Sequence, residues 1–168
     1  MLKKIATFLA VALMSIAVQQ VSAQELLTSV PTTKAEFIAS EKQVLITINW
    51  LETTPFDQDE TMRKAQNALL LQWLTESPTV TMELNTDVIP FMNTSPDLLL
   101  IFMGGWARYC LQNKYSTNNV QGSLAGIRSV IRVYKNMALK KDPELEKLIA
   151  LDEKGQLDGW VKTKVAKK

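Results

Sequence analysis

Histidine is absent from the 168 residues of this chain, and cysteine occurs only once. Without histidine, Ser-His and Cys-His catalysis, histidine zinc sites and histidine pH switches are excluded. A single cysteine also excludes a disulfide within the chain. Cys110 lies in the most apolar segment. This setting favours a buried structural thiol, because a reactive cysteine needs an electropositive and partly exposed environment.

Long hydrophobic runs are lacking as well. The longest uncharged apolar stretch is residues 5–18, which is too short to span a bilayer. Lys3 and Lys4 precede it, and small residues at 21–23 follow it. This order of positive, apolar and small residues is typical of an export signal. We therefore predict a signal peptide at 1–23, a mature chain from Gln24 without a membrane span, and a periplasmic or secreted location.

An excess of charge of one sign is also missing. The chain has 19 basic and 17 acidic residues, and removal of Lys3 and Lys4 with the signal leaves 17 of each. A neutral chain has no overall field that would gather nucleic acid. We therefore expect no nucleic-acid partner, and an unknown protein or small ligand instead.

The hydrophobic periodicity predicts an all-α fold with one compact domain at 24–168. Helix start signals stand at Thr33, at Asp57, at Ser95-Pro96-Asp97 and at Asp142-Pro143. About five helices are expected, at 33–51, 57–75, 96–111, 119–140 and 142–155. The apolar segment 96–111 is expected to be the buried central helix, residues 79–85 an extended connector, and the C-terminus a short, frayed basic tail.

Glycines in the middle of predicted helices need a reason, since each destabilises a helix by about 1 kcal/mol relative to alanine. Gly104 and Gly105 lie in the central segment, and the next helix carries a matching stripe of Gly122, Ser123 and Gly126. Close approach of the two helices, glycine against glycine, is the favoured interpretation.

A second interpretation is a ligand groove. Gly104 and Gly105 share one arc of the helical wheel with Arg108 and Gln112. In such a groove the Arg108 guanidinium would bind a carboxylate or a phosphate. Without a groove, Arg108 would be a salt-bridged or a snorkelling residue near a helix end.

A basic stripe forms a further candidate site. Arg128, Arg132 and Lys135 recur at i, i+4 and i+7 on the polar face of the helix at 119–140. An anion or an acidic partner could bind there, although such stripes are most often solvated surface.

Motifs for catalysis or for metal binding are lacking. The chain has no glycine-rich phosphate loop and no nucleophile elbow. The acidic stretch 57–60 lacks the glycine and the terminal glutamate of a calcium loop, and 152–158 has Lys154 where a ligand oxygen is needed. We therefore predict no catalytic residues, no metal site and no cofactor.

Several sequence blocks resemble small secreted helical proteins of unknown function from Bacteroidetes-type bacteria. They are SPDLLL and MGGWARY within 95–109, LAGIR and YK within 124–135, and two segments that run from Trp-Leu to proline at 50–55 and 73–78. The resemblance covers most of the chain after residue 23. It implies an envelope or secreted location and a helical domain, with no catalytic residues.

These observations predict a non-enzymatic, exported helical module for binding or structure. One alternative is a carboxylate-dependent hydrolase acting on cell-wall or glycan material, which would need two carboxyl groups about 5–9.5 Å apart in a cleft. Another is a subunit that buries an apolar patch against a partner or a second copy.

Overall fold

The computed structural model describes residues 25–167, and this part of the chain contains helices and no strand. The all-α prediction is therefore confirmed, while the predicted signal peptide at 1–23 lies outside the described residues. None of the helices within 25–167 is both long and apolar enough to cross a membrane. The elements are α1 (Lys34–Thr53), α2 (Glu60–Glu76), the 3-10 helices η1 (Thr86–Val88) and η2 (Pro90–Asn93), α3 (Leu98–Gln112), α4 (Asn119–Asn136), α5 (Pro143–Glu153) and α6 (Leu157–Val165).

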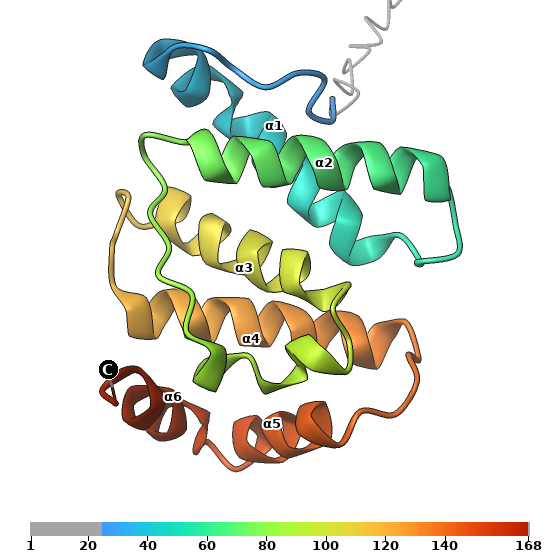
Figure 1. Ribbon diagram of the computed structural model, residues 1–168, viewed down its shortest axis with the longest axis vertical. Helices are drawn as coiled ribbons and strands as arrows, with labels where there is room; N and C mark the ends of the chain where they lie inside the picture. The colour runs from blue at the N-terminus through green and yellow to red at the C-terminus, as the bar shows by residue number, and fades with distance from the viewer. Residues whose placement is uncertain (1–24, 168) are drawn as a thin grey trace, which may run out of the picture.

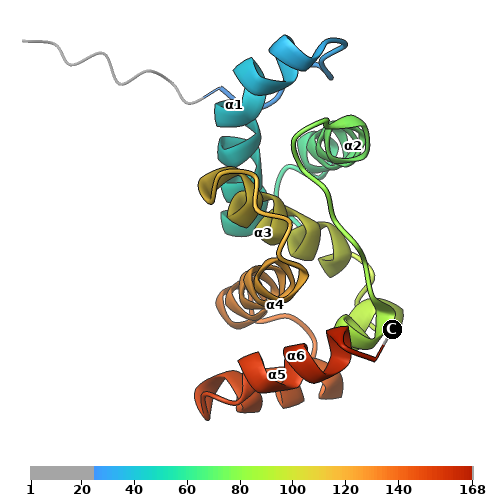
Figure 2. The same cartoon turned by 90° about the vertical axis from the view of Figure 1, so that its left-hand side faces the viewer.

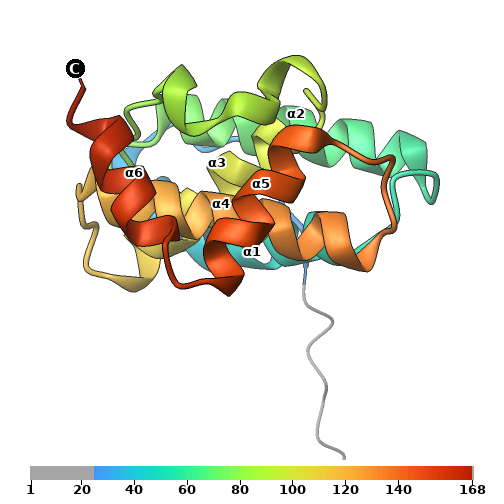
Figure 3. The ribbon, with the colours of Figure 1, turned by 90° about the horizontal axis from the view of Figure 1, so that it is seen from below.

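The helices form a stack, with α1 and α2 at one end, then α3, then α4, and finally α5 and α6 (Figures 1 and 2). The most extensive contact between two elements is that of α3 with α4. Helix α1 packs on α3, whereas α5 and α6 pack on α4 and cover the far end of the stack (Figure 3). The predicted central helix, α3, therefore shares the centre with α4.

The start of α1 matches the sequence prediction. The Thr33 side chain accepts the Glu36 N–H, and the Glu36 carboxylate accepts the Thr33 N–H, which is a complete capping box. The segment before it is also fixed. Leu27 is buried, its N–H donates to Thr47 Oγ1 at 2.9 Å, and its carbonyl accepts from Gln66 Nε2 at 3.1 Å.

The predicted cap of α2 is wrong. Helix α2 begins at Glu60 and its N-cap is Asp59, not Asp57. Asp59 has a φ of 50°, and its side chain makes no capping hydrogen bond. An aspartate adopts this left-handed conformation more readily than most residues, so the tight turn between α1 and α2 takes priority over the cap.

That turn is organised by Arg63 of α2, a buried residue whose importance the sequence did not suggest. One Nη of Arg63 donates to the carbonyl oxygens of Leu51, at 3.2 Å, and Thr54. The guanidinium also lies over the Phe56 ring, 4.6 Å from its centroid. Because the last turn of α1 has no basic residue of its own, Arg63 satisfies the carbonyls that its C-terminus leaves unpaired.

The start of α3 also differs from the prediction. Ser95 is not the N-cap, because the helix begins at Leu98 with Asp97 as its N-cap and a single turn before it. The Ser95 hydroxyl instead donates to Asp142 Oδ2 at 2.8 Å. A tertiary contact with the N-cap of α5 thus replaces the local cap.

Helix α4 ends at Asn136, four residues earlier than predicted. Ala138 has a φ of 46°, so the chain reverses there. The reversal lets the Asp142 N–H donate to the hydroxyl of Tyr134 at 3.0 Å, at the start of α5. Helix α6 was not expected as a separate helix. Burial of Leu157 and Val161 stabilises this helix. The helical structure therefore continues to Val165, into the segment that was predicted to be a frayed basic tail.

The network around Asp142 predicts acid sensitivity. Burial alone raises the pKa of Asp142, but the hydroxyls of Thr94 and Ser95 and the N–H groups of Glu144 and Leu145 outweigh it and hold the pKa below its ordinary value. A carboxyl whose pKa is lowered by folding stabilises the protein above the unfolded-state pKa. This contribution is lost as the pH falls from about 4 through the folded-state pKa.

Urea denaturation between pH 7 and pH 3 measures this contribution. We expect the free energy of unfolding of the wild type to fall over that range more steeply than that of Asp142→Asn, since asparagine caps a helix without titrating. Parallel pH profiles for the two proteins would contradict the role of Asp142.

Candidate functional site

The close approach of α3 and α4 depends on three glycines. A Cβ at Gly105 would lie 2.8 Å from the Ala125 carbonyl oxygen, and one at Gly126 would lie 2.7 Å from that of Phe102. A Cβ at Gly122 would overlap the Trp106 ring. The predicted close packing is therefore confirmed, although each glycine faces larger residues of the other helix rather than another glycine.

Gly104 lies elsewhere, and its predicted place in the groove is wrong. A Cβ there would meet Ile48 Cγ2 of α1 at 3.2 Å. The two adjacent glycines lie about 100° apart around the helix, so Gly104 packs on α1 while Gly105 packs on α4.

Between α3 and α4 the surface is hollowed by about 330 Å³, and we call this hollow the α3–α4 groove. Its lining includes most of the residues of the two candidate sites that the sequence indicated separately, the ligand groove and the basic stripe. Its polar lining comes from Arg108, Tyr109, Gln112 and Asn113 on the α3 side and from Gln121, Arg128, Ser129 and Arg132 of α4, with Gly105 at the contact between the helices.

Lys135, the third residue of the predicted basic stripe, does not line the groove. Its Nζ pairs with Glu153 Oε1 of α5 at 2.7 Å. One further turn of α4 carries this side chain past the groove toward α5, which packs on α4.

Glu52 fixes two of the three arginines. Its side chain, only 5% exposed, accepts from Arg108 Nη1 at 2.9 Å and from Arg132 Nη2 at 3.1 Å. Arg132 Nη2 also donates to Ser129 Oγ at 3.0 Å. One buried carboxylate from α1 therefore orients a guanidinium from α3 and another from α4, and these charge-assisted hydrogen bonds are stronger than neutral ones.

Arg128 is more loosely held. Its Nε pairs with Asp152 Oδ1 at 3.2 Å, and the Arg128 side chain is 53% exposed while that of Asp152 is partly buried. Exposed pairs of this kind are weak and exchange readily with solvent or with another anion.

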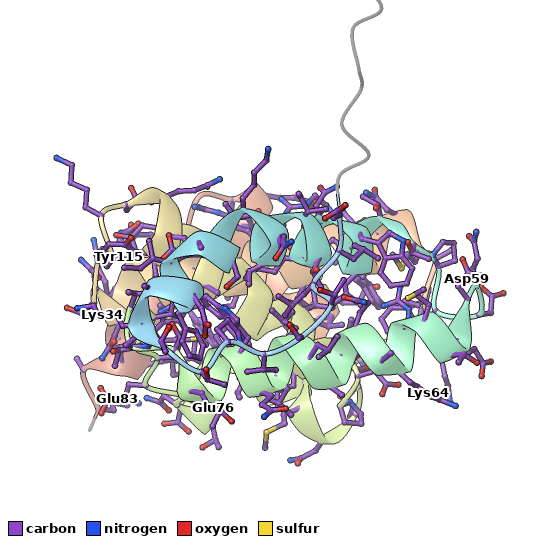
Figure 4. The ribbon with its side chains drawn as sticks, turned by 90° about the horizontal axis from the view of Figure 1, so that it is seen from above. Lys34, Asp59, Lys64, Glu76, Glu83 and Tyr115 are labelled. Atoms are coloured by element: carbon purple, nitrogen blue, oxygen red, sulfur yellow. The ribbon has the colours of Figure 1, made fainter. Side chains whose placement is uncertain are left out.

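The loop after α3 contributes Asn113 to the lining of the groove. Lys114 and Tyr115 both have positive φ, and the Tyr115 N–H donates to the Cys110 carbonyl at 2.8 Å. The Tyr115 hydroxyl donates to Glu41 of α1 at 3.3 Å, and Figure 4 shows this tyrosine at the same end of the molecule as Lys34. The loop is thereby tied to α1.

The groove offers hydrogen-bond donors, and the Ser129 hydroxyl that lines it accepts a hydrogen bond from Arg132 Nη2. Within residues 25–167 the side-chain amides of Gln112 and Gln121 make no hydrogen bond to protein. Cys110 is buried as predicted, and this burial raises the pKa of its thiol. A thiol in this state is inert. These guanidinium and amide groups can bind an anionic or a polar molecule.

A larger hollow of about 510 Å³ lies between residues 29–32 and α1. Its charged residue, Glu36, is already engaged with the N–H groups of Thr32 and Thr33. Each of the four hollows described within 25–167 is lined by at most one carboxylate. In the same part of the chain no three His, Cys, Asp or Glu residues are grouped as metal ligands.

The sequence did not single out Glu52, which orients two of the arginines, nor four of the residues that line the groove: Tyr109, Asn113, Gln121 and Ser129. A signal was present, because Glu52 follows Val44 and Ile48 at helical spacing and so lies on the apolar arc of its helix. An acid on such an arc is buried only when it is paired, which points to a cation from a neighbouring helix.

No protein-family model, no curated protein and no solved structure matches this chain.

Proposed function

We propose that this protein is an exported, non-enzymatic binding module of the periplasm or cell exterior, and that the α3–α4 groove is its binding site. The observation that carries the proposal is the meeting of three guanidinium groups and two free amides in one groove without a lining carboxylate. Ligand sites in proteins are concave and place a few polar groups at fixed positions, and Glu52 gives Arg108 and Arg132 such positions.

Export is supported by the order of residues in 1–23, which is typical of a signal peptide. Expression of the full chain, cell fractionation and N-terminal sequencing test this half of the proposal. We expect the protein in the envelope fraction or in the culture medium, with Gln24 as its first residue. Met1 retained in an intracellular fraction would contradict export.

Binding is tested by thermal unfolding of the envelope-purified protein with and without the low-mass fraction of the native envelope. A ligand at about 100 times its Kd stabilises a protein by about 2.7 kcal/mol, which raises Tm by about 5 °C or more at this size. We expect this rise for the wild type, and at most half of it for Gln112→Ala and for Arg108→Gln. Equal rises in all three proteins would contradict the assignment of the groove.

The hydrolase alternative gains no support from the groove. A glycosidase needs two carboxyl groups that flank its substrate. The two acids that touch the arginines of the groove, Glu52 and Asp152, are both held in ion pairs. Consumption of a component of the same envelope fraction by the protein would revive this alternative.

A further inference from the structure

We infer that the α3–α4 groove binds a singly charged carboxylate on a small hydroxylated molecule, of which an acidic monosaccharide is the simplest example. This inference rests on the proposed binding function and names the class of ligand. Three observations lead to it: the charge balance, the unused hydrogen-bond donors and the size of the groove.

The charge balance selects a single negative charge. Arg108 and Arg132 share the one carboxylate of Glu52, and Arg128 pairs with Asp152. Three guanidinium groups therefore face two carboxylates, and one positive charge is left over. A monoanion neutralises this charge, whereas a dianion would leave an excess negative charge near the carboxylates of Glu52 and Asp152, which repel it.

The unused donors fit a carboxylate. A guanidinium has five N–H donors in one plane, and its edge matches the two oxygens of a carboxylate. Glu52 takes a hydrogen bond from one Nη of Arg108 and from one Nη of Arg132. Arg108, 22% exposed, and Arg132, 50% exposed, both line the groove and so retain donors for a second anion.

The remaining lining fits hydroxyl groups. Gln112 and Gln121 each carry an amide with two donors and one acceptor. Such amides can donate to one hydroxyl and accept from its neighbour. The volume of about 330 Å³ is at the lower end for ligand sites, which favours a single ring over an extended chain.

Isothermal titration calorimetry of the envelope-purified protein at pH 8 tests the inference with D-glucose, D-glucuronate and D-glucose 6-phosphate. The three probes share one hydroxylated frame and carry zero, one and about two negative charges, since the second pKa of a phosphate monoester is about 6. We expect D-glucuronate to bind at least tenfold more tightly than either of the others.

Two variants locate the binding. Arg128→Gln removes the positive charge that is left over in the groove and leaves Asp152 unpaired, so it should weaken D-glucuronate binding about tenfold or more. Arg128 is exposed and only loosely paired, so this variant should fold. The matched control is Lys64→Gln, which removes an exposed charge from the outer side of α2, and it should leave the affinity unchanged (Figure 4).

Each other outcome overturns the inference. An equal affinity for D-glucose would show that binding does not require a charge on the ligand. A higher affinity for D-glucose 6-phosphate would show that the groove does not prefer a single charge. If no probe binds while the envelope fraction still raises the Tm of the wild type more than that of Gln112→Ala, the ligand class is wrong and the proposed function stands. If that stabilisation is absent as well, the proposed function fails too.

Discussion

Replacement of Glu52 by alanine is expected to lower the free energy of unfolding by about 3 kcal/mol. Removing one partner of a buried ion pair typically costs about 3–5 kcal/mol, because the other charge stays behind without compensation. Two arginines would lose their carboxylate here, but Arg132 is half exposed and can turn to water, which places the loss at the lower end. Urea denaturation at neutral pH measures this change.

Glu60→Ala is the matched control for Glu52→Ala. Glu60 also pairs with a cation, Lys64, but both side chains are largely exposed. An exposed i,i+4 pair is worth about 0.5 kcal/mol or less. Equal losses in the two variants would show that Glu52 does not hold the arginines of the groove.

Replacement of Gly126 by alanine is expected to destabilise the protein by about 2 kcal/mol, although alanine is the better helix former. The added methyl group would lie 2.7 Å from the Phe102 carbonyl oxygen, so the backbones of α3 and α4 would have to separate. Overpacking of this kind costs about 1–3 kcal/mol. We expect Tm to fall by about 4–8 °C in a calorimetric scan.

Gly159→Ala separates the packing effect from helix propensity. Gly159 lies within α6, and a Cβ there would meet no heavy atom within 4 Å. This variant should gain about 0.5–1 kcal/mol because alanine reduces the freedom of the unfolded chain. A gain for Gly126→Ala of similar size would refute the close contact between α3 and α4.

Local patterns in the sequence predicted the elements well where local chemistry decides them. The capping box at Thr33 and the cap at Asp142 both form as expected. Predictions failed where a side chain expected to cap a helix instead makes a tertiary hydrogen bond. The Ser95 hydroxyl, for example, donates to Asp142 and does not cap α3. A helical wheel cannot anticipate such competition, because Ser95 and Asp142 are distant in the sequence.

The groove was predicted in parts rather than as a whole. Periodicity placed Arg108 with Gln112 on one helix and Arg128 with Arg132 on another, but the distance between helices is not contained in either pattern. Gly104 was misplaced because α1, not α4, lies against its side of α3. Glu52 was missed because its role depends on partners from two other helices.

The measurement that tests the central claim most directly is a set of two-dimensional ¹H–¹⁵N NMR spectra of the envelope-purified protein during titration with the low-mass fraction of the native envelope. We predict chemical-shift changes concentrated at the backbone amides of Gly105, Gln112, Gln121 and Ser129, which line the α3–α4 groove. Changes confined to the hollow at 29–43, or the absence of any change, would contradict the assignment of this groove as the binding site.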